Sequence, residues 1–441
     1  MRLLNVNKNW VAGANGWFTF IASLQLALLA GAQTKPDYDL APVHYTTSKD
    51  VNTITRLQAA MDERKFTLPL SSSKDILRAI LDELKVPVSS QMLVFSKTSL
   101  QRELISAANP RAVYFNHDFY VGYVPGGMIE VIACDDPNGI MFYSFELNKQ
   151  EDKHRFVRNH ECMNCHANKN TMDVPGLLVR SVFAEKDGRM QLSLGSSLTT
   201  PASPIADRWG GWYVTGTHGQ TQHMGNKWVS TAEDGQHRFN KSEGQNVTDL
   251  SVYFDTGKHL AEGSDILALM IMEHQIQVHN MLASAKMGYF RRVYLGKAIN
   301  GDEYDAHSPT ARKMVQGYVD SILKTLLFAD EVELPEDGIN GSKVYQQDFV
   351  GQGVHYDGHS LRDLRLEKRL FKYRCSYMIY SKAFEQLPAA IKVPVLEKLH
   401  LIMTSEQAVA GFPALSSREK DRIHSILSHT HEAYRKVVAA K

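Results

Sequence analysis

Residues 112–147, AVYFNHDFYVGYVPGGMIEVIACDDPNGIMFYSFEL, carry the clearest β-strand pattern of the chain. Three segments in this stretch are rich in β-branched and aromatic residues: VYFNHDFYVGYV, MIEVIAC and IMFYSFEL. Pro125-Gly126-Gly127 and Asp136-Pro137-Asn138-Gly139 separate these segments, and such residues favour tight turns. The pattern predicts a three-stranded antiparallel meander.

A polar stretch leads from the meander into NHECMNCHANKN, residues 159–170, which contains Cys162, Cys165 and His166. Two cysteines separated by two residues and followed at once by histidine are typical of haem c attachment. Each thiol can add to one vinyl group of the porphyrin, and the adjoining imidazole can then ligate the iron. The motif therefore predicts one covalent haem, with Cys162 and Cys165 as anchors and His166 as the proximal iron ligand.

A zinc knuckle or a redox dithiol would use the same cysteine spacing. A structural zinc site needs four ligands, usually with a second close pair, whereas the remaining cysteines, Cys134 and Cys375, are distant in the sequence. A thioredoxin-type dithiol needs a βαβ setting. Cys134 and Cys375 each lie in an apolar run, so a disulfide and two buried free thiols are equally compatible with the sequence.

The first 32 residues have the pattern of a secretory signal peptide. A basic start precedes a largely apolar run over residues 17–30, and Ala30-Gly31-Ala32 is a cleavage pattern before Gln33. We expect export to the periplasm, with an uncut N-terminal anchor as the alternative. No later segment reaches the ~18 uninterrupted apolar residues of a membrane helix, so we expect no membrane span after cleavage.

The chain of 441 residues has 49 basic and 48 acidic residues. This near-neutral balance gives no basis for binding nucleic acid or an anionic membrane surface. The length allows more than one hydrophobic core.

Strand patterns continue after the motif, and helical patterns follow them. GLLVRSVF and MQLSLGS flank a turn at residues 185–188 and predict a second hairpin. Helical spacing is found over residues 71–86 and again from Ser264, which we expect to cap a long helix. Further helices are expected over residues 310–329, 361–383, 393–404 and 417–440.

These patterns predict an α+β fold, with a β-meander and hairpin around the haem motif and a mainly helical C-terminal part. The expected divisions are a signal peptide (1–32), an N-terminal lead-in and helix (33–111), a haem c-binding α+β domain (112–250) and a mainly helical domain (251–441).

The stretch RWGGWYVTGTHGQTQHMGN, residues 208–226, combines aromatic, imidazole and thioether side chains with glycines that permit close approach to a ring. An aromatic core turn would have the same composition. As a haem contact, the stretch predicts Arg208 beside a propionate, Trp209 and Trp212 along the porphyrin, and His218, His223 or Met224 as the sixth iron ligand or as an acid–base group. Other candidates near the haem are His160, Met172, Met190 and His274.

The Cys-x-x-Cys-His motif resembles that of the c-type cytochromes. Longer segments resemble a group of large exported bacterial proteins with a single such motif and no characterised activity; these segments are PRAVYFNHDFYVGYVPGG, VPGLLVRSVF, RWGGWYVTGTHGQTQHMGN, SDILALMIMEHQIQVHN and RLFKYRCSYMIYSKAF. The resemblance implies a haem protein of the cell envelope. The chain also resembles, more distantly, the two-haem peroxidases and oxygenases of the periplasm, which carry two such motifs where this chain has one.

The ligand opposite His166 decides which reaction a c-type haem performs. Met or His in that position gives an electron carrier, whereas an open position gives peroxide or O2 chemistry. We expect electron transfer with a redox partner protein of the envelope, because the second haem motif of the related peroxidases is missing. The alternatives are a haem peroxidase or oxygenase acting on a small substrate, with His218 or His223 as the catalytic group, and a haem-based sensor or scaffold.

Overall fold

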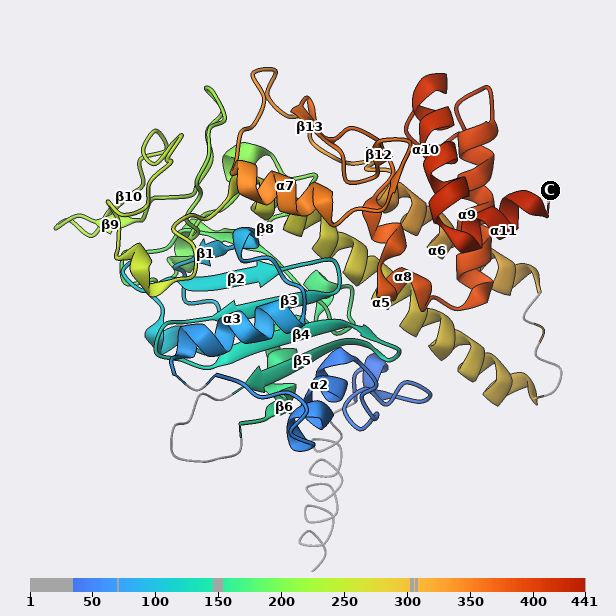
Figure 1. The fold of residues 1–441 in the computed structure, drawn as a ribbon, viewed down its shortest axis with the longest axis horizontal. Coiled ribbons are helices and arrows are strands. Elements are labelled where there is room, and N and C mark those ends of the chain that lie inside the picture. Colours follow the sequence, from blue (N-terminus) through green and yellow to red (C-terminus); the bar gives the residue numbers. More distant parts are fainter. Residues whose placement is uncertain (1–34, 70, 146–153, 302–304, 306–307, 441) are drawn as a thin grey trace, which may run out of the picture.

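A computed structural model describes residues 35–69, 71–145, 154–301, 305 and 308–440. The predicted signal peptide over residues 1–32 and its cleavage point before Gln33 lie outside the described residues. An antiparallel six-stranded sheet, with its strands in sequence order, forms the centre of the fold, and helices surround it (Figure 1). The predicted α+β architecture with a mainly helical C-terminal part is confirmed.

The strands of the sheet are β1 (Met92–Val94), β2 (Arg111–Phe115), β3 (Phe119–Tyr123), β4 (Ile129–Asp136), β5 (Gly139–Phe145) and β6 (Phe156–Arg158). Short hairpins pair β7 (Arg180–Val182) with β8 (Ser196–Leu198), β9 (Ser230–Thr231) with β10 (His237–Arg238), β11 (His355–Tyr356) with β12 (His359–Ser360), and β13 (Leu364–Glu367) with β14 (Arg369–Phe371).

The described α-helices are α2 (Thr53–Asp62), α3 (Ser73–Glu83), α4 (Met163–His166), α5 (Ile266–Asn300), α6 (Pro309–Leu326), α7 (Lys343–Gly351), α8 (Lys382–Glu385), α9 (Ala389–Thr404), α10 (Ser417–Thr430) and α11 (Glu432–Ala439). None of the helices in these described ranges combines the length and the apolar character needed to cross a bilayer.

The first segment of the predicted meander is two strands instead of one. Asn116 ends β2, and its side-chain oxygen accepts hydrogen bonds from the backbone N–H groups of Asp118 and Phe119. This local turn reverses the chain, so that residues 111–145 form four strands where the sequence predicted three. β1 and β6 extend the sheet at its two edges.

Both faces of the sheet are covered. All five residues of β3 are buried, and a strand whose side chains alternate between faces needs cover on both sides to bury them all. Helix α3, within the predicted helical range of residues 71–86, lies across one face (Figure 1), capped by Ser72 and buried along its apolar side. The other face carries Val113, Gly122 and Glu130 in register, and it faces the Cys-x-x-Cys-His segment and α5.

The predicted second hairpin is only partly confirmed, because the strand that pairs with β7 begins at Ser196, at the end of the predicted second strand, and a single isolated bridge, Ala184 to Met190, flanks the predicted turn. β7 and β8 pair antiparallel, and the Gly188 N–H donates to the Glu185 carbonyl oxygen at the turn. A 3-10 turn at Leu192–Leu194 interrupts the second arm.

Several C-terminal helices lie where the sequence placed them. Helix α6 matches its prediction and packs against α5 and α9, and α9 begins four residues earlier than predicted. The single helix predicted over residues 417–440 is two helices, α10 and α11, and α7 was not predicted. The predicted helix over residues 361–383 is wrong, because that segment forms β13, β14 and two short helical turns. Leu366 and Lys368 adopt left-handed backbone conformations, which end helical propagation, even though the apolar residues nearby have helical spacing.

Helix α5 begins at a different cap from the predicted one. Asp265, and not Ser264, accepts hydrogen bonds from the first helical N–H groups, those of Leu267 and Ala268. The Ser264 hydroxyl instead accepts from the Leu93 N–H and donates to the Tyr213 carbonyl oxygen, so it joins β1 to the core.

Asp265 provides a test of this start of α5. Burial raises its pKa to about 6, although three backbone N–H bonds act in the opposite direction. The folded chain therefore binds this proton more tightly than the unfolded chain, and the resulting stability is present below about pH 4 and is lost as the pH rises through about 6. Asp265→Asn keeps the oxygen that caps α5 and removes the titrating proton. It also removes the oxygen that accepts from the Ser342 N–H, which lowers the stability by an amount that does not change with pH.

We expect the free energy of unfolding of the wild type to fall, relative to Asp265→Asn, by up to about 1.4 kcal/mol per pH unit between about pH 4 and 6. Urea unfolding of both proteins across this range measures the difference. A difference that stays constant with pH would contradict the assignment.

Candidate cofactor site

The Cys-x-x-Cys-His segment forms a 3-10 turn at His160–Cys162 followed by α4, between β6 and β7. Residues three apart lie on the same side of such a helix, and the thiols of Cys162 and Cys165 both line a cavity of about 610 Å³. This volume is within the ~300–1,000 Å³ of small-molecule and cofactor sites. The motif therefore lies on a short helix between the six-stranded sheet and the β7–β8 hairpin.

His166 lines the same cavity in a defined tautomer. Its Nδ1 lies 2.8 Å from the Gly176 carbonyl oxygen, which can only accept, so Nδ1 carries the proton and Nε2 carries the lone pair. Burial lowers the pKa of His166, which keeps the ring neutral. A neutral imidazole oriented by an Nδ1 hydrogen bond to a carbonyl is the usual state of a histidine that ligates a metal.

The loop that orients His166 is fixed by helix α5. The Gly176 N–H donates to the His166 carbonyl oxygen, and the Asn280 side chain bonds both the N–H and the carbonyl of Leu177, at 2.8 and 2.7 Å. A Cβ atom at Gly176 would lie 2.6 Å from Asn280 Oδ1. The only sign of this arrangement in the sequence is Asn280, an asparagine within a largely apolar helix.

One face of the six-stranded sheet forms the floor of the cavity. Gly122 of β3 has no side chain, and the ion pair of Arg111 and Glu130 lies over it. The apolar walls come from the sheet, from the loop after the motif and from α5: Val94, Val113, Ile132, Phe142, Leu177, Val179, Met190, Trp212, Met272 and Ile276.

The charges that line the cavity are mostly basic. Arg111 is paired with Glu130 and Arg102 with Glu103, whereas Lys97 and Arg180 form no ion pair among the described residues, although the charge of Lys97 helps to lower the pKa of Asp187. Glu161 is a second carboxylate in the lining. Glu130 stays a carboxylate, because its contacts with Arg111, Gln101 and Ser99 lower its pKa against the effect of burial. The two unpaired cations could each neutralise one carboxylate of a bound cofactor.

The site lacks the properties of a redox dithiol. Burial raises the pKa of the Cys162 thiol to about 12, whereas reactive dithiols have lowered values. The central sheet is antiparallel throughout, so the motif does not lie in a βαβ unit. In the described part of the chain, no three His, Cys, Asp or Glu side chains gather as they would around a bare metal ion.

Arg208 and Trp209 are engaged away from the cavity. Arg208 Nη1 lies 2.7 Å from Glu273 Oε2, and Trp209 Nε1 donates to Glu273 Oε1 over 2.6 Å. All three side chains are buried. Neither Arg208 nor Trp209 lines the cavity, whereas Trp212 does, so the predicted propionate and porphyrin contacts of Arg208 and Trp209 gain no support there.

His218, His223 and Met224 are packed together in the core and do not line the cavity. The two imidazole rings lie 4.7 Å apart. His218 Nε2 accepts from the Asn246 N–H and His223 Nδ1 from the Gly225 N–H, while Met224 Sδ lies 3.6 Å from Ser181 Oγ. The segment 208–226 is therefore mainly an aromatic core turn, the alternative that its composition also allowed.

Of the other candidates, Met190 lines the cavity. Met172 is exposed and lies outside the lining, as does His160. His274 is buried, with Nε2 at 2.7 Å from Ser376 Oγ and its ring stacked on Phe328. Cys134 and Cys375 are buried free thiols.

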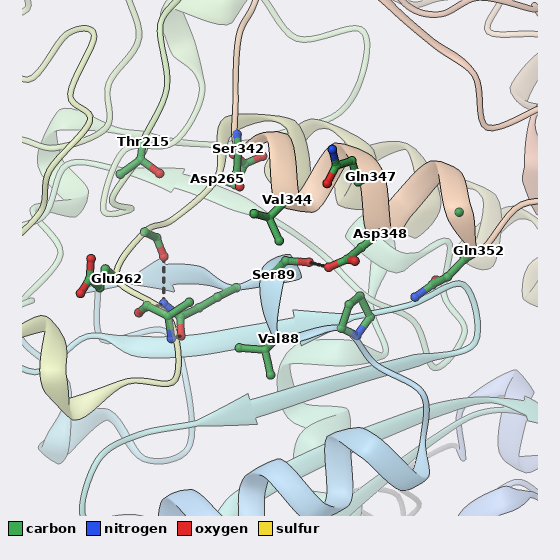
Figure 2. Close-up of a pocket in the computed structure, with 15 residues that line it drawn as sticks. Val88, Ser89, Thr215, Glu262, Asp265, Ser342, Val344, Gln347, Asp348 and Gln352 are labelled. Atoms are coloured by element: carbon green, nitrogen blue, oxygen red, sulfur yellow. Dashed lines mark hydrogen bonds between the residues drawn. The ribbon is translucent and has the colours of Figure 1, made fainter.

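A second cavity, of about 840 Å³, lies between α7, the segment after α3 and the segment before α5 (Figure 2). It contains none of the predicted haem residues. Its charged groups are Glu262, Asp265 and Asp348, and the last two are already bonded, Asp265 as the cap of α5 and Asp348 to the Ser89 hydroxyl. The cavity beside Cys162 is therefore the candidate site.

Comparison of the chain with protein-family models, with curated proteins and with solved structures gave no match.

The buried contact of Glu273 with Arg208 and Trp209 predicts a large loss of stability on truncation. Glu273→Ala leaves a buried guanidinium without its counter-charge, so the free energy of unfolding should fall by about 3–5 kcal/mol. Glu333→Ala, which truncates an exposed glutamate, is the control and should change it by about 0.5 kcal/mol or less. Urea unfolding measures both, and equal values for the two variants would refute a structural role for the network.

Proposed function

We propose that this chain is an exported c-type cytochrome that holds one covalent haem in the 610 Å³ cavity and transfers electrons in the cell envelope. One observation carries the proposal. The His166 Nδ1–H bond to Gly176 leaves the Nε2 lone pair for an iron, in a cavity that both thiols of the motif also line.

Each group that haem c requires has a candidate among the lining residues. Cys162 and Cys165 would form the thioether bonds, and His166 would be the proximal ligand. Lys97 and Arg180 would pair with the two propionates, and Trp212 would contact the ring. The bound haem would supply one-electron chemistry, and an envelope redox protein would be the partner.

Met190 is the proposed sixth ligand. His166 is the only imidazole in the described lining, and the thioethers there are Met190 and Met272. Met272 is buried in the core on α5, whereas Met190 is half-buried on the β7–β8 hairpin. His and Met ligation raises the reduction potential of a c-type haem, which suits an electron carrier.

A haem peroxidase is the second candidate, and a particular observation favours it. The cavity contains the Arg111–Glu130 pair, with Ser99 donating to Glu130 over 3.0 Å, and the ring of Tyr120. Polar groups of this kind beside an iron can serve peroxide chemistry. A thioether is also a weaker ligand than an imidazole, so a peroxide could displace it.

Residues 1–32 support the export part of the proposal through their signal-peptide pattern. Haem attachment in the periplasm would follow export, which is consistent with thiols that the structure leaves unpaired.

The covalent haem is tested by removing the two anchors. The double variant Cys162→Ala, Cys165→Ala, expressed with a haem-attachment system, should lose all haem staining on a denaturing gel, because both thioether bonds are absent. The matched control is Cys134→Ala, Cys375→Ala, which removes two buried thiols outside the cavity and should keep the stain. Staining that persists in the first variant, or is lost equally in both, would contradict the proposal.

The sixth ligand is tested by two volume-conserving changes of lining methionines, each of which should cost less than about 1.5 kcal/mol of stability. Met190→Leu should convert the ferric haem from low-spin to high-spin and open it to cyanide, because the strong-field thioether is gone. Met272→Leu should leave the visible spectrum unchanged. If Met272→Leu alone changes the spin state, then Met272 is the ligand, and if neither does, the iron is ligated from elsewhere.

A further inference from the structure

Tyr120 of β3 connects the cavity to a buried hydrogen-bond network on α5. Its ring lines the cavity, and its hydroxyl lies 3.0 Å from His279 Nδ1 and 2.9 Å from Gln275 Nε2. The side chain is buried, and its ring stacks on Phe115 with a centroid distance of 6.1 Å. None of these contacts is needed to hold a haem.

The groups that contact the two ends of the Gln275 amide determine the direction of its hydrogen bonds. Gln275 Nε2 lies 2.5 Å from the Asn116 carbonyl oxygen, which can only accept, so this end of the amide is the nitrogen. The other end, Oε1, accepts from Tyr377 Oη at 2.8 Å. The amide nitrogen therefore also donates to Tyr120 Oη. In the tautomer that carries the ring proton on Nε2, His279 Nδ1 accepts the phenol proton of Tyr120.

Both members of the Tyr120–His279 pair are neutral at rest. Burial raises the pKa of Tyr120 well above its ordinary value and lowers the pKa of His279 to about 3. The phenol therefore loses its proton only when it also loses an electron. Loss of an electron makes a phenol a strong acid, and the proton then has an acceptor already in hydrogen-bond contact.

We propose that Tyr120 is a proton-coupled one-electron donor to the haem, acting when the haem has been oxidised by a hydroperoxide. This inference rests on the proposed haem and adds peroxide reduction to its function. It requires that the peroxide displaces Met190.

The electrons and protons balance as follows. The hydroperoxide O–O bond breaks, and two electrons and two solvent protons convert it to an alcohol and water. Tyr120 passes one electron to the oxidised haem and its proton to His279 Nδ1, which leaves a neutral phenoxyl radical beside an imidazolium. The envelope redox partner then returns the electron to Tyr120, His279 returns the proton, and the partner supplies the second electron.

The experiment uses the full chain with its haem, in the wild type and in Met190→Leu. Samples are mixed with hydrogen peroxide, frozen within milliseconds and examined by electron paramagnetic resonance. We expect a tyrosyl radical signal that is stronger in Met190→Leu and falls to background when Tyr120→Phe is added. The matched control is Tyr114→Phe, which removes the hydroxyl of a buried tyrosine bonded to Gln91 outside the cavity lining and should keep the signal.

His279→Gln distinguishes a proton acceptor from a packing residue. Glutamine can accept the Tyr120 hydrogen bond but cannot take the proton, so we expect the radical signal to fall to background while the haem spectrum is unchanged. A signal that survives in His279→Gln would overturn the proton-coupled role.

Haem staining and cyanide binding of the same samples show whether the proposed cytochrome or only the proposed role of Tyr120 is wrong. A preparation of Met190→Leu without covalent haem refutes the proposed cytochrome itself. A preparation with haem that binds cyanide, but gives no radical or gives the same radical in Tyr120→Phe, refutes only the role of Tyr120. A haem that excludes cyanide in Met190→Leu also refutes it, because peroxide could not reach the iron.

Discussion

The hydrogen bond from His166 Nδ1 to the Gly176 carbonyl oxygen is the interaction on which the site depends. It sets the tautomer of the ring, and so it determines which nitrogen can bind a metal. Gly176 is in turn held by the Asn280 side chain through Leu177, and Asn280 belongs to the longest helix of the structure, α5. The orientation of the imidazole is thus fixed by a rigid element far away in the sequence.

Helix α5 also carries one member of a buried charge pair that is not available to a ligand, in contrast to the charged residues that line the cavity. Glu273 on α5 holds Arg208 in a fully buried pair, where both charges are compensated and neither is available to a ligand. Lys97 and Arg180 at the cavity have no such partner among the described residues. Under the proposed function, these two cations would pair with the two carboxylates of a haem.

Local patterns were sufficient to predict part of this arrangement. The β-branched and aromatic segments of residues 112–147 and the turns between them predicted an antiparallel meander, and the Cys-x-x-Cys-His spacing drew attention to the segment that lines the cavity. The extra strand was missed because the Asn116 turn interrupts an otherwise continuous apolar run. The helix predicted over residues 361–383 failed because two residues in left-handed conformations, Leu366 and Lys368, redirect a segment whose spacing is helical.

The distal side of the site could not be predicted in this way. Aromatic rings, imidazoles and glycines serve a core turn as well as a haem contact, so the composition of residues 208–226 could not decide between them. Met190 and Tyr120 reach the cavity through tertiary packing of the β7–β8 hairpin and of β3. The sequence named Met190 only as one of several candidates, and its place beside the motif, like that of Tyr120, becomes visible only when these elements are placed around the motif.

The protein carries either one covalent haem or none, and intact-mass spectrometry of the purified native protein with peptide mapping decides this most directly. The predicted result is a chain that begins at Gln33, with the mass of one haem added and located on the peptide that contains Cys162 and Cys165. A chain with the mass of the polypeptide alone, and both thiols free for alkylation, would contradict the assignment of the cavity to a c-type haem.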